Sequence, residues 1–190
     1  MLVHSLEHKD LSSLTAKSIS AYCWTLRLER KGGLIMQIAA AVLSILIVLS
    51  YAGLSGFWVE SNSGWYNSLK KPFWQPPNFV FGIIWPYNFF VLAIAGVQVS
   101  LNSDLLHSGL WLLTLSVSVG FAIAWSWDFY KNRKLARSAL WLSMCALVTI
   151  GLMVQLSQIY PSMFWWLFPY QLWLVVAASL AAGYAQMNPK

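Results

Sequence analysis

Residues 65–77 read WYNSLKKPFWQPP and lie between two long apolar runs. This segment combines aromatic side chains with prolines at 72, 76 and 77 and a lysine pair at 70 and 71. Trp and Tyr favour the membrane–water interface, which accommodates both an apolar ring and a polar group. We therefore expect a proline-stiffened loop at a membrane surface, in a position to cover a cavity between helices.

The composition places the chain among membrane proteins. Of its 190 residues, 58% are hydrophobic and 9% are charged, whereas an average soluble domain has about 25% charged residues. The 12 tryptophans fit a bilayer interface. The net charge of +6 comes from basic clusters beside the apolar runs, where anionic lipid headgroups would meet them. Nucleic-acid binding is not expected, because no soluble basic domain is present.

Five apolar runs predict an all-α, integral membrane bundle of five transmembrane helices. About 20 residues are needed to cross the hydrocarbon layer, and only hydrogen-bonded helices or closed barrels can do so. The expected spans are 34–58, 79–100, 109–129, 136–158 and 162–186. The chain thus divides into a polar N-terminal tail (1–33), with an amphipathic helix near 14–28, a membrane domain (34–186) and a short C-terminal tail (187–190).

The distribution of Lys and Arg predicts the orientation. With five spans, the loop at 65–77 shares a side with the C-terminus. That side carries seven basic residues, and the other carries five, all of them in the N-terminal tail. Because cytoplasmic loops are enriched in Lys and Arg, we expect the C-terminus and the first interhelical loop to be cytoplasmic.

Two spans carry aromatic faces next to a proline. In the second span, Phe81, Trp85, Asn88 and Phe89 fall on one helical face. Pro86 opens a backbone hydrogen bond there. This face is either a packing stripe or one wall of a pocket. Asn88 favours the pocket, because polar side chains at membrane depth face protein or water.

The fifth span repeats the pattern with Trp166, Tyr170 and Trp173 beside Pro169. Two such faces that met would line a flat, mostly apolar cleft. A cleft of that kind suits a planar hydrophobic ligand held by stacking.

The third span has small residues at four-residue spacing, Ser116, Gly120 and Ala124. Such a seam serves either packing within the chain or a homodimer. Trp125 and Trp127 follow it, at the border either of the pocket or of the interface belt. Asp128, at the end of this span, is expected to form an ion pair with Lys131 or Arg133.

The chain has no recognisable set of residues for hydrolysis, phosphate binding or metal coordination. Cys23 and Cys145 are far apart in sequence, and the only other soft ligands are three histidines. Neither a disulfide framework nor a metal site is expected.

The sequence motifs resemble those of the TspO/MBR family, the tryptophan-rich sensory proteins related to the translocator protein (peripheral benzodiazepine receptor). The family pattern Trp-Tyr-x-x-Leu-x-Lys-Pro-x-Trp-x-Pro-Pro is met by Trp65, Tyr66, Leu69, Lys71, Pro72, Trp74, Pro76 and Pro77. The continuation Val-Phe-Gly-x-x-Trp is met by Val80, Phe81, Gly82 and Trp85, and Pro-Tyr-x-x-Trp by Pro169, Tyr170 and Trp173. The resemblance covers residues 34–186.

The resemblance implies a membrane bundle, often a homodimer, that binds tetrapyrroles such as protoporphyrin IX, haem or a bilin, or sterol-like lipids. No cofactor is obligatory in this reading. Tyr66, Trp85 and Trp173 match positions that line the family's pocket, and the loop before Pro77 matches its lid. By the same resemblance, Trp85 and Trp173 would support light-dependent porphyrin breakdown.

The chain departs from the family pattern at polar positions. The family has an asparagine before the tryptophans of the third helix. This asparagine is missing here, whether the helix is aligned on its tryptophans or on the aromatic pair Phe129 and Tyr130. Ala181 stands where the last helix commonly has Asn, and Phe89 stands in place of a Tyr. The expected function is a membrane sensor that binds a tetrapyrrole, in stress or pigment regulation. The alternatives are a photo-oxidative enzyme, a transporter of porphyrins or lipids, or a scaffold with a vestigial pocket.

Overall fold

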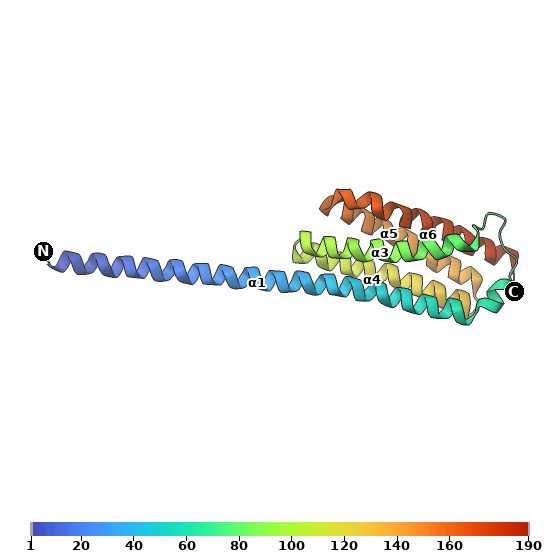
Figure 1. Ribbon diagram of the computed structural model, residues 1–190, viewed down its shortest axis with the longest axis horizontal. Helices are drawn as coiled ribbons and strands as arrows, with labels where there is room; N and C mark the ends of the chain where they lie inside the picture. Colours follow the sequence, from blue (N-terminus) through green and yellow to red (C-terminus); the bar gives the residue numbers. More distant parts are fainter. Residues whose placement is uncertain (1, 190) are drawn as a thin grey trace.

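The computed structural model describes the backbone of residues 2–189 and the side chains of residues 32–189. The elements are α1 (Leu2–Ser61), α2 (Ser63–Ser68), α3 (Asn78–Asn102), α4 (Leu105–Ser126), the π-helix η1 (Trp127–Lys131), α5 (Leu135–Ile159) and α6 (Pro161–Met187). Helix α1 runs on from the bundle towards the N-terminus as one long rod (Figure 1). The side chains of the predicted tail, and Cys23, lie outside the described residues.

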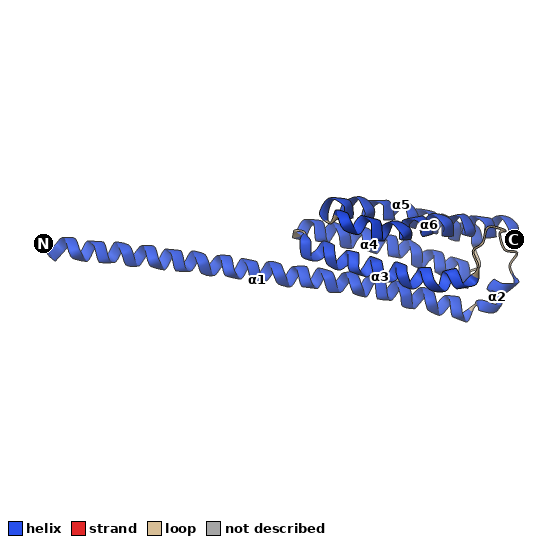
Figure 2. Cartoon of the chain, turned by 45° about the horizontal axis from the view of Figure 1, so that its top comes forward, coloured by secondary structure: helices blue, strands red, loops and turns tan. Residues whose placement is uncertain are grey.

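The five long helices form a closed ring around a large shared core. Helix α1 packs against α3 and α4, α5 lies between α4 and α6, and α3 completes the ring against α6. Figure 2 shows the helices side by side along a common direction, with α2 and the following loop at the end that carries the C-terminus. We refer to this end as the lid end.

The structure confirms the predicted all-α membrane bundle. Within the described residues, five helical segments are long and apolar enough to cross a membrane. They are Gly32–Ser61, Asn78–Asn102, Leu105–Lys131, Leu135–Ile159 and Pro161–Met187. Large apolar side chains such as Leu49, Phe90 and Leu113 are more than half exposed on the outer faces. Lipid accommodates such side chains, whereas a water-facing surface of this extent would be unfavourable.

The core includes Leu92, Leu115, Leu142 and Leu174, each at most 1% exposed. Helices α1 and α3 approach each other closely at Gly96. A Cβ placed on Gly96 would lie 2.5 Å from the Cβ of Ser44. The missing side chain therefore allows the two backbones to approach, as small residues do in membrane bundles.

Asp104 begins α4 at the end of the bundle opposite the lid. Its carboxylate accepts a hydrogen bond from the backbone N–H of His107 at 2.9 Å, which is an N-cap. This bond is the main cause that lowers the pKa of Asp104. The cap lets α3 and α4 join through a connection of two residues.

Candidate functional site

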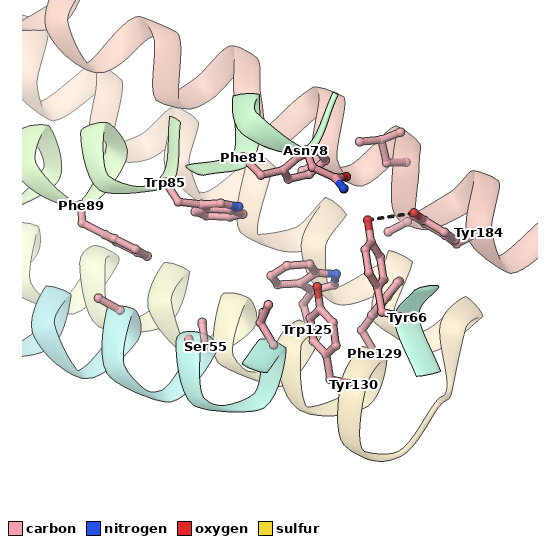
Figure 3. Close-up of a pocket in the computed structure, with 16 residues that line it drawn as sticks. Ser55, Tyr66, Asn78, Phe81, Trp85, Phe89, Trp125, Phe129, Tyr130 and Tyr184 are labelled. Atoms are coloured by element: carbon pink, nitrogen blue, oxygen red, sulfur yellow. Dashed lines mark hydrogen bonds between the residues drawn. The ribbon is translucent and has the colours of Figure 1, made fainter. Parts of the chain in front are cut away.

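A cavity of about 340 Å³ opens between α1, α3, α4 and α6 at the lid end. Its volume lies at the low end of the range for small-molecule sites. The lining residues, several of which are labelled in Figure 3, are Ala52, Ser55, Gly56, Val59, Tyr66, Asn78, Phe81, Trp85, Phe89, Trp125, Phe129, Tyr130, Ala177, Leu180, Ala181 and Tyr184. The set contains no charged side chain.

Aromatic rings dominate the walls. The rings of Trp85 and Trp125 are nearly parallel, with an interplanar angle of 20° and centroids 6.0 Å apart. Trp173 makes T-shaped contacts with both Phe81 and Trp85, at 5.2 and 6.3 Å between centroids. Tyr51 packs behind Trp85 and Phe89. The tryptophan faces are thus held by a second layer of rings and are suited to a flat ligand.

The wall contributed by α1 is formed by small side chains. Ala52, Ser55, Gly56 and Val59 follow the i, i+3, i+4, i+7 spacing of one helical face. Larger residues at these positions would fill the space between α1 and the aromatic wall of α3. The cavity therefore depends on this small-residue face as much as on the tryptophans.

The π-helix η1 brings Phe129 and Tyr130 into the cavity. Three consecutive residues, Asp128, Phe129 and Tyr130, are 2%, 3% and 7% exposed, although an α-helix turns successive side chains by about 100°. The wider turn of a π-helix places all three inward, and such turns occur frequently at functional sites.

Asp128 anchors this turn. Its carboxylate accepts bonds from Arg137 Nε and Nη2, the latter at 2.6 Å, and from Asn132 Nδ2 and Trp141 Nε1, at 2.7 and 2.8 Å. The predicted ion pair of Asp128 with Lys131 or Arg133 is therefore wrong, because its partner is Arg137. The π-turn points Asp128 into the bundle, where α5 supplies Arg137 as a two-pronged partner.

The loop at 69–77 is fastened to the last turns of α6. Side chains of Pro72 and Trp74 occupy the space above Gly183, where a Cβ would lie 2.8 Å from each. The Asn188 amide pairs with the backbone of Lys70 in both directions, each at 3.0 Å. This loop lies at the same end of the bundle as the cavity, where Gln75 bonds to the lining residue Tyr184. We refer to residues 69–77 as the lid.

The end of the cavity nearest the lid, which we refer to as its mouth, carries hydrogen-bonded side chains. The hydroxyl groups of Tyr66 and Tyr184 lie 2.9 Å apart, and Tyr184 also bonds to the Gln75 side chain. Figure 3 shows Tyr66 and Tyr184 facing each other beside Phe129 and Tyr130. Two cations flank this region: Lys71 Nζ lies 5.3 Å from the Tyr66 ring centroid, and the Arg133 guanidinium 5.3 Å from that of Trp65.

Five of the predicted ligand-binding residues line the cavity: Tyr66, Phe81, Trp85, Phe89 and Trp125. Trp173 lies directly behind them, 7% exposed, against Phe81 and Trp85.

Three other predicted ligand-binding residues lie away from the cavity. Asn88 and Tyr170 are buried in the bundle, each 1% exposed. Trp166 is 61% exposed, in the first turns of α6.

The predicted lid residues remain together. Trp65 packs on Phe129 under the lid, and Lys71 faces the Tyr66 ring. Pro72 is buried on α6, Trp74 is 41% exposed, and Pro76 and Pro77 lead into α3.

The predicted seam residues Ser116 and Gly120 are exposed on the outer face of α4, with Ala124 half-buried beside them.

Several lining residues were not predicted from the sequence. The small face of α1 carried a readable signal, namely its helical spacing. Asn78, Ala177 and Leu180 carried none, because one apolar or polar residue in a span does not reveal its depth. Tyr130 and Tyr184 enter through the π-turn and the end of α6, which only the assembled bundle positions.

The fold is that of a multi-pass membrane protein, with an aromatic cavity at the end of the bundle where the proline-rich loop lies. Residues 40–187 match the TspO/MBR family. The chain belongs to this family, as the sequence motifs predicted.

Several curated proteins are similar over most of their length. Protein CrtK of Rhodobacter capsulatus is 30% identical over 75% of this chain and 89% of its own. The uncharacterized membrane protein YtaB of Bacillus subtilis is 25% identical over 80% of this chain and 98% of its own. A tryptophan-rich sensory protein of Cereibacter sphaeroides is 28% identical over 65% and 77% of the two chains.

Proposed function

We propose that this protein binds a tetrapyrrole in the cavity under the lid and acts as a membrane sensor of that ligand. The observation that carries the proposal is the pair of nearly parallel indoles, Trp85 and Trp125, in a cavity without charged walls. Flat apolar macrocycles are held on such faces by stacking and by exclusion of water.

The charge around the mouth supports the same ligand class. Lys71 and Arg133 lie at the lid, outside the apolar walls. A protoporphyrin has an apolar ring and two acidic side chains on one edge. Its ring would lie between the helices, and its acids would reach the two cations, which favour carboxylates at a partly hydrated site.

A matched pair of serine variants of α1 tests the proposal. Ser55 lines the cavity and is 8% exposed, so Ser55→Leu would fill the space that the ligand needs. Ser50 faces outward and bonds to the carbonyl of Leu46, so Ser50→Leu adds the same bulk towards lipid. We expect at least a tenfold loss of affinity for protoporphyrin IX in the first variant and little change in the second.

The measurement is a dark titration of the detergent-purified protein with protoporphyrin IX, followed by tryptophan quenching and porphyrin absorption. Saturable quenching that Ser55→Leu weakens supports the proposal. Quenching that does not saturate, or that is equal in both variants, would show partition into detergent and contradict it.

Light-dependent breakdown of the bound ligand is a second candidate function. Trp85 forms part of the cavity wall and contacts both Trp125 and Trp173, so indoles lie where an excited porphyrin would meet them. This function predicts that light and dioxygen consume bound protoporphyrin IX and that Trp85→Phe slows the loss. Stable absorption of the complex under light would exclude it.

A further inference from the structure

Each of the five long helices contributes a polar side chain to the interior of the bundle at mid-depth. These are Tyr51 of α1, Asn88 of α3, Ser118 of α4, Cys145 and Thr149 of α5, and Tyr170 of α6, and none of them is more than 1% exposed. Polar groups at this depth need hydrogen-bond partners inside the protein, because lipid offers none. We refer to these six residues as the polar centre.

Helices α4, α5 and α6 bring four of the six together. Ser118 Oγ lies 3.0 Å from Thr149 Oγ1 and 3.5 Å from Cys145 Sγ. Thr149 Oγ1 also donates to the backbone carbonyl of Cys145 at 2.8 Å. The Tyr170 hydroxyl lies near Cys145 and Ser118, so a phenol from α6 stands beside this bonded group.

Tyr51 joins the group from α1. Its ring packs against Phe89 with centroids 5.0 Å apart, so it lies level with the turn of α3 that carries Asn88. The Tyr51 hydroxyl also lies near Cys145 and Tyr170. The two phenols therefore approach the thiol of α5 from different helices.

Asn88 and Tyr170 lean towards each other along the bundle axis. Tyr87 donates to the carbonyl of Trp166 at 2.7 Å, so Asn88 is level with the turn of α6 that precedes Tyr170. Helical side chains lean towards the N-terminus of their own helix. Because α3 and α6 run in opposite directions, Asn88 leans towards the lid end and Tyr170 away from it, which reduces the offset of one turn.

Three residues of the polar centre carry polar atoms that no described residue satisfies. They are the hydroxyl groups of Tyr51 and Tyr170 and both the nitrogen and the oxygen of the Asn88 amide. A buried donor or acceptor without a partner is unfavourable. In folded proteins such groups are commonly satisfied by ordered water, which makes about three hydrogen bonds at a buried polar site.

We propose that the polar centre is a closed binding site for water, and that bound water bridges Tyr51, Asn88 and Tyr170. The amide and each phenol can both donate and accept, and water does the same, whereas an anion needs donors alone and a cation needs acceptors alone. This inference goes beyond the proposed function and does not depend on it.

The position of the site gives the bound water a structural role. Tyr51 packs against Trp85 and Phe89, and both of these rings line the cavity. Water held at Tyr51 would therefore connect side chains of different helices directly behind the aromatic wall.

Cys145 is an infrared probe within the site. The chain has two cysteines, so Cys23→Ser leaves Cys145 as the only thiol, and the S–H stretching band falls where other protein groups absorb little. After transfer into heavy water, water in the site would exchange the thiol proton while the hydrogen-bonded amides of the helices stay protected.

We expect the S–H band of Cys23→Ser to disappear while the protected part of the amide II band persists. An S–H band that decays only as slowly as those amides would show a dry centre and overturn the proposal. This measurement needs no substitution in the core, so it is decisive even where a core variant fails to fold.

Asn88→Leu in the Cys23→Ser background tests the place of the water. Leucine offers no hydrogen bond and would fill the space beside the amide, so it should slow the exchange of the Cys145 thiol several-fold. Asn102→Leu is the matched control, because Asn102 is exposed near the end of α3 and bonds to the carbonyl of Gln98. Equal exchange in both variants would overturn the assignment to Asn88.

A pair of tyrosine variants distinguishes bound water from unsatisfied hydroxyl groups. If water bonds to Tyr170, Tyr170→Phe removes one of its partners and lowers the midpoint of thermal unfolding in detergent. If the hydroxyl had no partner, its removal would relieve an unfavourable burial. Tyr160→Phe, at the connection between α5 and α6, is the control. A midpoint of Tyr170→Phe at or above that of the control would overturn the proposal.

Discussion

At the scale of single residues, Asp128 is a carboxylate that is only 2% exposed. A buried charge in a membrane protein requires polar partners. Its carboxylate is held by Arg137, Asn132 and Trp141. Together these bonds keep the π-turn in the position that presents Phe129 and Tyr130 to the cavity. The ion pair at this position therefore supports the site, although it does not touch the cavity.

We expect Arg137→Ala to lower the stability of the folded protein by about 2 kcal/mol, the value for hydrogen bonds to a charged group. Arg137→Lys should restore only part of it, because an ammonium cannot bond to both carboxylate oxygens as a guanidinium does. Thermal unfolding in detergent, followed by tryptophan fluorescence, measures both variants. Lys131→Ala, at an exposed side chain of the same turn, is the control. An unchanged midpoint in Arg137→Ala would refute this role.

At the scale of helices, α1 and α3 come into close contact at Gly96. A Cβ at this position meets the Cβ of Ser44 at 2.5 Å, and neither atom can move without its backbone. Gly96→Ala should therefore separate the helices and cost about 1–3 kcal/mol. Gly82→Ala is the control in the same helix, since nothing lies within 4 Å of a Cβ there.

A second substitution tests the cause of the Gly96→Ala effect. Ser44→Gly removes the opposing Cβ, so the double variant should regain much of the lost stability. The measurement is again the midpoint of thermal unfolding in detergent. If Gly96→Ala and Gly82→Ala unfolded alike, close contact would not be what holds α1 to α3.

The helices also explain how much of the site the sequence could predict. The spacing of Phe81, Trp85 and Phe89 placed them correctly on one inward face of α3. Trp166 shares its helical angle with Tyr170 and Trp173, yet it is 61% exposed. Periodicity gives the face of a helix but not the depth along its axis, and each residue adds about 1.5 Å.

That depth follows from antiparallel packing, which only the assembled bundle sets. The lining residues of α6 begin at Ala177 and end at Tyr184. They meet the first half of α3, where Asn78 and Phe81 lie. The π-turn at Trp127–Lys131 was likewise not predictable, because its register depends on the partner that α5 supplies to Asp128.

At the scale of the whole molecule, the bundle presents two different ends and one unusual outer face. The lid end carries the C-terminus and the basic residues of the lid, and its cytoplasmic orientation stays a prediction from the Lys and Arg distribution. The outer face of α4 exposes Ser116 and Gly120. The Ser116 hydroxyl donates to the carbonyl of Leu112 in its own helix, so this side chain does not project from the face.

Gly120 and Ala124 line a shallow groove, together with Trp58, Trp127, Trp141 and the Asp128–Arg137 ion pair. A helix of a second copy could approach closely over the two small residues, because small residues let backbones pack in lipid. We therefore expect a homodimer through this face. Gly120→Leu would fill the groove and shift the population to monomers.

The experiment is cross-linking and light-scattering chromatography in mild detergent, at several protein concentrations. Gly82→Leu adds the same side chain on α3, at an exposed position where a Cβ meets nothing within 4 Å, and it should leave the dimer intact. Because the cavity opens between α1, α3, α4 and α6 of one chain, monomeric Gly120→Leu should still bind protoporphyrin IX in the dark. A dimer that persists in Gly120→Leu would assign the seam to lipid contact instead.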